Sequence, residues 1–451
     1  MPDFTKMSLE ELLNPQGFDC ACGRHHGVGM QHLRVGQGAL EALPEFLGAL
    51  GVKRPFVFCD ENTLEAAGHA VKGLLDRAGI PHTLYTLPAK HPEPDEMVCG
   101  GLLMAFDPRC DGVVAVGSGV INDSGKVLAH ALGLPLLCVA TAPSMDGYAS
   151  DSSSMVRDGV KVSLYNACPQ ALIADTGILR QAPMRLLQAG LGDMLAKYCS
   201  VCEWRIAHLV TKEYYCPDIA ALMREALRRV RDAAGGLTSR DPGAVEQVTQ
   251  GLILAGIAMA FAEVSRPASG LEHYFSHIWE MMALERGLPM ELHGIQVGIG
   301  TLLTLGIWEQ LKQETPSRET AQAFIDSFDE AAWEAMVRRI FGGTAGTILK
   351  TARAEGRNDP AAHARRLETT LKKWPEILRI VEEELPPHDQ LLSLMQGLGM
   401  PVIPQDIGFS REDTVDALFG AREIRNKYLT SSLLWDLGLL YTKAADWLEA
   451  P

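Results

Sequence analysis

The first 175 residues alternate short apolar runs with segments of helical periodicity, and this alternation constrains the fold more than any other feature of the chain. Strands that alternate with helices are typical of βαβ units, which build a parallel sheet covered by helices. The sequence therefore predicts a doubly wound α/β domain with a parallel sheet. The predicted strands are Phe56–Cys59, His82–Tyr85, Gly112–Val116, Leu136–Ala140 and Ala171–Ala174. The predicted helices are Glu61–Ala78, Asp95–Phe106 and Asp123–Leu132.

The pattern changes at Pro183, after which apolar residues recur at helical spacing nearly to the end of the chain. Before this point, Ser152–Ser163 predicts an antiparallel hairpin inserted between strands, with Gly159 near its turn. We therefore expect three parts. They are an N-terminal lead-in over residues 1–30, an α/β domain over 31–182 and an all-helical domain over 183–451.

Composition and charge exclude several classes of protein. The formal net charge of −15 at pH 7 argues against general binding to nucleic acids or to anionic membranes. We expect no apolar stretch to span a bilayer. The first residues, M-P-D-F-T-K-M-S-L-E-E-L-L, lack a basic region followed by an apolar block, so we expect no signal peptide. The ten cysteines are then expected to be reduced thiols in a cytoplasmic protein.

A glycine-rich turn follows the predicted strand Gly112–Val116, in the segment G-S-G-V-I-N-D-S-G-K at 117–126. Gly117 and Gly119 let the backbone approach a bulky anionic group, and the next helix can offer its N-terminal N–H groups to a phosphate. Asn122 stands where the usual dinucleotide fingerprint has its third glycine. The turn therefore indicates a nucleotide site at the carboxyl end of the sheet, although its pattern departs from the fingerprint.

Polar residues around this turn support the nucleotide hypothesis. Asp123 is expected to cap the following helix, and Lys126 to meet a phosphate or a nearby carboxylate. Thr141 and Ser144 place hydroxyls at the end of the neighbouring strand. Asp60 directly follows the strand P-F-V-F-C, where a carboxylate can bind an adenosine ribose and repel a 2′-phosphate. This favours NAD over NADP; the alternative is that Asp60 only caps the next helix.

Three histidines and an aspartate form a candidate metal site in the helical part. His273 and His277 are four residues apart, so they share one face of a helix. His293 follows a break at Gly287–Pro289, and Asp193 lies in the helical segment A-G-L-G-D-M-L-A-K-Y. Any two of the histidines with Asp193 would give a divalent cation three ligands and leave a position for substrate. The alternative for each lone histidine is a helix-surface or hydrogen-bonded core residue.

A second metal-like cluster lies near the N-terminus, in the segment C-A-C-G-R-H-H. Cys20, Cys22, His25 and His26 are zinc-type ligands within a short reach. Their spacing is tighter than in most structural zinc sites, and no second pair of ligands is near in sequence. The alternative is an irregular lead-in that packs on the first strand.

Several motifs, taken in chain order, resemble one family, the bacterial sn-glycerol-1-phosphate dehydrogenases. They are C-D-E-N-T near Asp60, T-A-P-S-M-D-G-Y-A-S at 141–150, G-L-G-D-M-L-A-K at 190–197, S-R-P-A-S-G-L-E-H-Y-F-S-H at 265–277 and H-G-I-Q-V-G at 293–298. The resemblance extends from about Leu33 to Tyr441. These enzymes share a superfamily with iron-containing alcohol dehydrogenases, glycerol dehydrogenase and 3-dehydroquinate synthase. The resemblance implies a dinucleotide-binding α/β domain followed by an all-helical domain that binds metal and substrate.

The resemblance also implies a role for each matching residue. Asp193, His273 and His293 would bind a divalent metal, nickel or zinc in different members, with iron as a third candidate. His277 and Asp193 would be catalytic and, with Asp146, would contact the substrate. The implied NAD contacts are Asp60, Gly117, Ser118, Gly119, Val120, Ile121, Thr141, Ser144 and Ser150.

The activity implied by the resemblance is hydride transfer between NAD(H) and the pair sn-glycerol 1-phosphate and dihydroxyacetone phosphate. The product would serve phospholipid synthesis, and a homodimer is favoured. For the substrate phosphate, Arg266 and Lys161 are candidates; the alternative for Arg266 is a helix-terminal salt bridge. Three other functions stay open. They are a glycerol or alcohol dehydrogenase of the same superfamily, a dehydroquinate synthase-like lyase, and a non-catalytic sugar-phosphate sensor.

Overall fold

The computed structural model describes residues 2–89, 92–157 and 160–448. The chain forms two compact units. Unit 1 comprises Met1–Met194 and Cys216–Ser265, and unit 2 comprises Leu195–Tyr215 and Arg266–Pro451. The predicted boundary between residues 182 and 183 separates the last strand from the helices, but it does not separate the two units.

A six-stranded parallel sheet forms the centre of unit 1. Its strands are β3 (His32–Gly36), β4 (Pro55–Asp60), β5 (Thr83–Leu87), β6 (Gly112–Gly117), β7 (Leu136–Ala140) and β10 (Ala171–Asp175), in the order β3-β10-β7-β6-β4-β5. The predicted parallel sheet is confirmed. Strand β3 was not predicted, because its segment H-L-R-V-G is only partly buried and its polar His32 and Arg34 leave no continuous apolar run.

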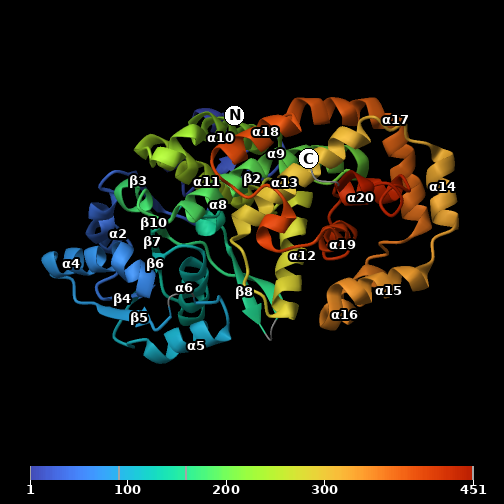
Figure 1. The fold of residues 1–451 in the computed structure, drawn as a ribbon. Coiled ribbons are helices and arrows are strands. Elements are labelled where there is room, and N and C mark those ends of the chain that lie inside the picture. Colours follow the sequence, from blue (N-terminus) through green and yellow to red (C-terminus); the bar gives the residue numbers. More distant parts are fainter. Residues whose placement is uncertain (1, 90–91, 158–159, 449–451) are drawn as a thin grey trace. The chain divides into compact units, whose positions relative to one another are not determined.

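Helices cover the two faces of this sheet (Figure 1). Helices α2 (Leu43–Ala49) and α4 (His69–Arg77) share a hydrophobic core with the side chains of one face. On the opposite face, α6 (Gly119–Leu132) approaches β6 so closely that a Cβ on Gly125 would lie 2.9 Å from the Cβ of Ala115. Helix α5 (Glu96–Ala105) packs beside α6. The sheet thus holds the start of α6 at the carboxyl end of β6.

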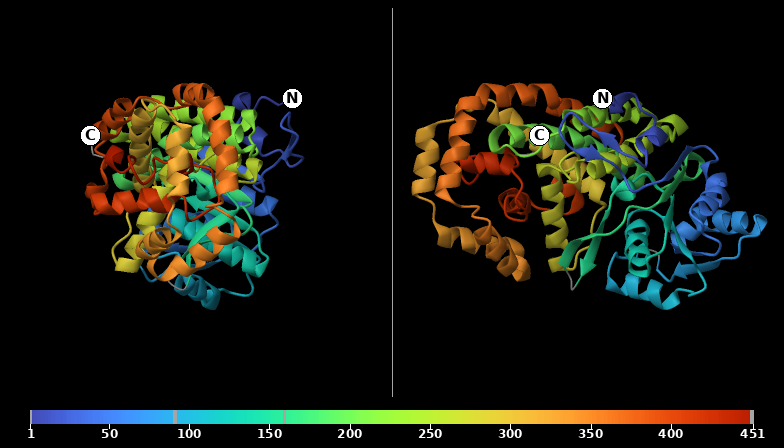
Figure 2. Two further views of the ribbon diagram at one scale, coloured as in Figure 1. Left: turned by 90° about the vertical axis from the view of Figure 1, so that its right-hand side faces the viewer. Right: turned by 180° about the vertical axis from the view of Figure 1, so that it is seen from behind.

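Two further features complete the α/β part of unit 1. Strands β8 (Ser152–Arg157) and β9 (Val160–Tyr165) pair antiparallel, which confirms the predicted hairpin (Figure 2). Gly159, predicted near its turn, lies outside the described residues. A helical segment over residues 61–77 follows β4, as predicted. The helix predicted to begin at Asp123 begins earlier, at Gly119, so Asp123 lies inside α6 and does not cap it.

Unit 1 also contains helices that come after the sheet in the sequence. They are α7 (Thr176–Leu179), α8 (Met184–Leu195, up to Met194), α10 (Pro217–Ala233) and α11 (Pro242–Ala262). Helix α11 corrects the expectation that no stretch is long and apolar enough to span a bilayer, because its length and composition meet that test. However, 72% of its apolar window is buried inside the protein. It packs against α10, so its apolar surface is used in the core of unit 1.

The described residues of unit 2 form helices and no strand. Helices α12 (Leu271–Arg286) and α13 (His293–Leu311) pack against each other, and α19 (Arg411–Ala421) packs on α12. The remaining longer helices are α9 (Lys197–Thr211), α14 (Arg318–Asp326), α15 (Glu330–Phe341), α16 (Ala345–Ala354), α17 (Pro360–Glu384), α18 (His388–Gly397) and α20 (Thr430–Asp436). The predicted change from α/β to all-helical structure is confirmed.

Candidate functional site

The glycine-rich turn of unit 1 leads directly from β6 into α6. Gly117 must be glycine because an added Cβ would lie 2.4 Å from the Cβ of Ile121. At Gly119 an added Cβ meets nothing nearer than 3.8 Å, so this glycine is not required by packing. Ser118 is the N-cap residue, and among the described residues it makes no side-chain capping hydrogen bond. The first turn of α6, from Gly119 to Ile121, therefore presents N–H groups of the kind that bind phosphates.

Asp60 ends β4 and caps the next helix. Its Oδ1 accepts a hydrogen bond of 2.7 Å from the backbone N–H of Thr63, and the Asp60 N–H donates to Thr63 Oγ1 at 2.9 Å. The capping interpretation is thus confirmed. The cap hydrogen bond uses only Oδ1 of the carboxylate. Contact of this carboxylate with a ribose stays a prediction.

Lys126 organises the segment that follows β7. Its ammonium group is buried and donates to the backbone oxygens of Gly147, at 2.6 Å, and Ser152, at 2.9 Å. It also donates to Ser150 Oγ at 3.2 Å and lies 3.6 Å from a carboxylate oxygen of Asp123. Lys126 was predicted to meet a phosphate or a carboxylate, and in the structure it lies beside the Asp123 carboxylate. Its hydrogen bonds hold the 141–152 loop.

The three hydroxyl residues predicted to contact NAD lie in this loop and are buried. The backbone N–H of Thr141 donates to Gly117 O at 3.2 Å, so the start of the loop lies beside the glycine-rich turn. Ser150 Oγ donates to Gly147 O at 3.0 Å, which makes Ser150 a support of the loop. Contacts of Thr141, Ser144 and Ser150 with a cofactor stay predictions.

The same loop joins two predicted substrate residues. The backbone N–H of Asp146 donates to Asp193 Oδ2 at 3.0 Å. The Asp193 side chain is fully buried in α8, and Gly190, one turn earlier, allows the close approach. A Cβ on Gly190 would lie only 1.8 Å from the carbonyl oxygen of Pro143. The motif G-L-G-D therefore places a buried carboxylate against the 141–152 loop.

The three predicted histidines gather in unit 2. His273 lies in the first turn of α12, His277 lies one turn later, and His293 begins α13. The ring centres are 5.2 Å apart for His273 and His293, 5.8 Å for His277 and His293, and 6.4 Å for His273 and His277. The histidines are therefore grouped rather than scattered, and metal binding by this group stays a prediction beside the alternative of hydrogen-bonded residues.

Two buried glutamates orient these rings, and neither is among the site residues predicted from the sequence. Glu272 Oε1 lies 2.9 Å from His273 Nδ1. Glu280 lies between the other two rings, 3.5 Å from His277 Nδ1 and 3.3 Å from His293 Nδ1. Carboxylates at one ring nitrogen are typical of histidines that bind a metal through the other. The spacing His277 to Glu280 within one helix is the signal that could have found Glu280.

Electrostatics around the first histidine match this arrangement. Burial, together with the positive charge of Lys197, holds the pKa of His273 well below its ordinary value. A neutral imidazole is the form that coordinates a cation. Burial also raises the pKa of the Glu272 carboxyl to about 8, and the negative charge of Glu203 adds to this rise. His273 is therefore held in the form that suits a ligand of a divalent cation.

Neither proposed phosphate residue gains support. Arg266 is 1% exposed, its guanidinium is paired with the Glu213 carboxylate, and it donates to Tyr428 O at 3.0 Å. The salt-bridge interpretation of Arg266 is confirmed. Lys161 lies in β9 of the hairpin, half-buried.

Unit 2 offers another cationic group that the sequence analysis missed. A polar cavity of about 500 Å³ is lined by arginines and by Lys427. Lys427 Nζ lies 3.4 Å from Ser269 O and 5.8 Å from the ring centre of Tyr274, so it adjoins the histidine-bearing segment 265–277. Its pKa is lowered to about 7 by burial and by the charges of Arg266 and Arg425.

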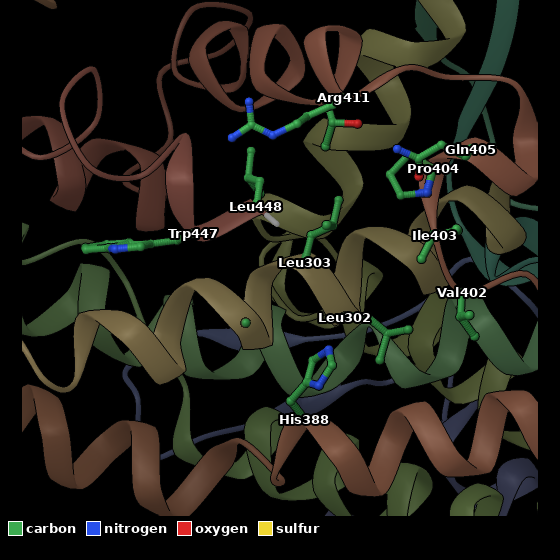
Figure 3. A pocket seen from close by; sticks show the side chains of 12 residues that line it. Leu302, Leu303, His388, Val402, Ile403, Pro404, Gln405, Arg411, Trp447 and Leu448 are labelled. Atoms are coloured by element: carbon green, nitrogen blue, oxygen red, sulfur yellow. The ribbon is translucent and has the colours of Figure 1, made fainter. Parts of the chain in front are cut away.

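A second cavity in unit 2, of about 270 Å³, is mostly apolar (Figure 3). Leu302 and Leu303 from α13, His388 from α18 and Arg411 from α19 contribute to its wall. Its lining includes none of the predicted site residues, so it is separate from the histidine group.

The sequence of this chain is similar to those of known dehydrogenases. Residues 34–183 match the family model described as iron-containing alcohol dehydrogenase. A glycerol-1-phosphate dehydrogenase (NAD(P)+) of Halalkalibacterium halodurans is 34% identical over 300 residues, which cover 64% of this chain and 74% of the relative. The chain belongs to the glycerol-1-phosphate dehydrogenase family. The family extends beyond this one relative. The Bacillus licheniformis enzyme of the same name is 29% identical over 93% of each chain, and that of Methanosarcina mazei is 35% identical over 62% of this chain and 78% of its own.

Solved structures agree on the fold. A probable glycerol dehydrogenase from Sinorhizobium meliloti 1021 superposes with a TM-score of 0.60 at 17% identity, over 94% of this chain and 99% of its own. An iron-containing alcohol dehydrogenase from Thermotoga maritima gives a TM-score of 0.56 at 16% identity, over 94% and 99%. The predicted superfamily fold, a parallel-sheet domain followed by helices, is thereby confirmed.

Proposed function

We propose that this protein reduces dihydroxyacetone phosphate to sn-glycerol 1-phosphate with NADH, and catalyses the reverse reaction with NAD⁺. The observation that carries the proposal is the 34% identity to a relative named glycerol-1-phosphate dehydrogenase, in a chain that gathers His273, His277 and His293. In the reduction, a hydride passes to the carbonyl carbon and a proton to the carbonyl oxygen.

We propose Asp193, His273 and His293 as the metal ligands. Their donor atoms, one buried carboxylate and two imidazoles, are those that nickel, zinc and iron bind in proteins. A bound divalent cation would polarise the substrate oxygen, while the nicotinamide would supply or accept the hydride. Glu272 and Glu280 keep the two imidazoles oriented for this role.

The residues of this chain would then position the substrate and move its proton. His277, 22% exposed and 3.5 Å from Glu280, can hold a proton at its ring and pass it to the substrate oxygen. The Asp146 segment, held by Asp193 and Lys126, would contact the substrate hydroxyls. For the phosphate we propose Lys427, because it is a cationic group that adjoins the histidine segment and lines a polar cavity.

The cofactor proposal is NAD rather than NADP. Asp60, at the end of β4, would meet the adenosine ribose and repel a 2′-phosphate. The segment 117–121, which ends β6 and begins α6, would bind the pyrophosphate through its N–H groups. Thr141, Ser144 and Ser150 would line the remaining contact with the cofactor.

Three finer statements go with this proposal. The protein would act in the cytoplasm, since its acidic composition and many buried cysteines suit a reducing compartment. It would be a homodimer, and its product would supply phospholipid synthesis. The homodimer and the role in phospholipid synthesis follow from the family resemblance.

One assay tests the function. The enzyme is stripped of metal, reloaded separately with nickel, zinc or iron, and assayed by NADH oxidation. Dihydroxyacetone phosphate should be reduced at least ten times more efficiently than dihydroxyacetone, and stereospecific enzymes should identify the product as sn-glycerol 1-phosphate. Preference for the unphosphorylated ketone would instead identify a glycerol dehydrogenase. NAD binding without turnover under any metal would point to a sensor.

A further inference from the structure

The N-terminal residues of unit 1 form a small hairpin around a pair of cysteines. Strands β1 (Phe18–Asp19) and β2 (His25–His26) pair antiparallel. The turn between them is closed by hydrogen bonds from Cys20 N to Arg24 O and from Gly23 N to Cys20 O, both 3.1 Å. Cys20 and Cys22 therefore lie on one tight turn, with His26 on the second strand.

A fourth ligand-type side chain comes from a distant part of unit 1. Cys216 immediately precedes α10, and its sulfur lies 3.7 Å from Cys20 Sγ and 3.7 Å from His26 Nε2. Cys22 Sγ lies 3.3 Å from His26 Nε2. The ligand atoms of Cys20, Cys22, His26 and Cys216 all lie within 4.8 Å of one another.

We propose that these four side chains bind a structural zinc ion as a Cys₃His site. Tetrahedral zinc, with Zn–S near 2.3 Å and Zn–N near 2.0 Å, places two sulfur atoms about 3.8 Å apart and a sulfur and a nitrogen atom about 3.5 Å apart. The sulfur pair at 3.7 Å and the two sulfur–nitrogen pairs at 3.3 and 3.7 Å lie close to these values, within about 0.2 Å. A sulfur pair 3.7 Å apart is too far for a disulfide bond of about 2.05 Å.

The histidine is oriented for this role. His26 is fully buried, and its Nδ1 lies 2.7 Å from the carbonyl oxygen of Phe261. Nδ1 therefore carries the ring proton, and the neutral Nε2 lone pair points at the sulfur atoms. A backbone carbonyl at one ring nitrogen is the usual outer contact of a zinc-bound histidine. His25, included in the sequence hypothesis, is not part of the cluster, because its Nδ1 pairs with Asp19 at 2.9 Å and its side chain is 58% exposed.

The ion would fasten the lead-in to the helices of unit 1. Cys216 is at the start of α10, while the rings of Phe4, Phe18 and His26 contact Phe261 near the end of α11. A zinc ion would thus join residues nearly two hundred positions apart. The Cys20 thiol donates to Asp218 Oδ2 at 3.2 Å. Binding converts the thiols to thiolates, so metal uptake should release protons.

Cobalt(II) substitution of the full-length protein tests the site by a readout other than activity. The protein is freed of metal under reducing conditions and titrated with cobalt(II) alone. We expect thiolate-to-cobalt charge-transfer bands in the near ultraviolet, which a carboxylate and histidine site does not give, and an excess of zinc should displace them. Cys20→Ser and Cys216→Ser should lose these bands, while the half-buried Cys99→Ser should keep them.

The result is independent of the proposed catalytic metal. Asp193→Asn should keep the thiolate bands even if it loses turnover, so failure of either proposal can be recognised separately. Cys22→His offers a variant that retains four ligands, and it should still bind cobalt with weaker charge-transfer bands. The zinc site is refuted if reduced wild-type protein gives no thiolate bands. It is equally refuted if the bands survive Cys216→Ser, or if peptide mapping finds these cysteines in a disulfide.

Discussion

The backbone N–H of Asp146 donates a 3.0 Å hydrogen bond to Oδ2 of Asp193, so the 141–152 loop and the proposed metal ligand are held together within unit 1. The bond orients the carboxylate, which is fully buried in α8. A metal ligand at this position would therefore be preorganised before the cation binds.

Asp193→Asn should abolish catalysis while preserving the fold. An amide can still accept the Asp146 hydrogen bond, but it lacks the negative charge that stabilises a divalent cation. We expect kcat/KM to fall by at least about 100-fold and the bound catalytic metal to be lost. Steady-state kinetics and metal analysis would check this. Asp175→Asn is the matched control, since Asp175 is also a buried carboxylate in unit 1 but caps α7, and it should keep metal and turnover.

Asp60→Asn should weaken discrimination against NADP. Asparagine preserves the N-cap, so the melting temperature should change little, whereas removal of the negative charge relieves repulsion of a 2′-phosphate. We expect the ratio of kcat/KM for NADPH to that for NADH to rise at least about tenfold, a gain of about 1.4 kcal/mol. Asp95→Asn, which alters the similar cap of α5, should leave the ratio unchanged. An unchanged ratio in Asp60→Asn would remove Asp60 from the cofactor site.

Glu280→Gln should impair the histidine pair that it orients. The glutamine keeps the size of the side chain but removes the charge that faces His277 Nδ1 and His293 Nδ1. Loss of such an outer contact costs about 10–100-fold in metal affinity or activity. Competition with a chelator would measure the affinity, and kcat the activity. Glu285→Gln, on an exposed position of the same helix, provides the comparison and should behave as wild type.

Lys427 should make recognition of the phosphate depend on pH. Its ammonium pKa is lowered to about 7 by burial, Arg266 and Arg425, and this fall is opposed by Glu272 and Glu213. As pH rises through 7, the free enzyme loses this charge, so KM for dihydroxyacetone phosphate should rise between pH 7 and 9. The second ionisation of a phosphate ester, near pH 6, is nearly complete in that range.

Two variants separate charge from packing at this position. Lys427→Arg should flatten the pH dependence, because a guanidinium stays charged. Lys427→Met should raise KM for the phosphorylated substrate about tenfold or more at pH 7 and leave KM for dihydroxyacetone unchanged. The exposed Lys443→Met is the control. Equal effects of Lys427→Met on both substrates would mean that this lysine does not recognise the phosphate.

The sequence predicts the fold well where burial is continuous. Strands β4, β6, β7 and β10 are buried at every position, so their apolar runs are unambiguous. Edge strand β3 is half-exposed and lacks that signal. Asp123 looks like a helix cap in the sequence, but the helix begins four residues earlier, where Gly117 packs on Ile121.

The site residues divide in the same way. The four-residue spacing of His273 and His277 predicts that they share a helix face, and in the structure both lie near His293. Glu280 and Lys427 are ordinary charged residues in the sequence, and only tertiary packing brings them beside that group or its segment. Cys216 could not be predicted as a ligand either, because Cys20, Cys22 and His26 lie almost two hundred residues before it in the sequence. Local patterns thus identify residues that share an element, while partners from separate elements require the three-dimensional structure.

The 1.8 Å clearance between position 190 and the Pro143 oxygen has an evolutionary consequence. Even alanine cannot be accommodated without shifting Pro143, and with it the chain that runs on to Asp146. A substitution is thus easier to accommodate at the flanking residues of the loop than at position 190. Any variant that replaces this glycine should need a compensating change in residues 141–146 before it can regain activity.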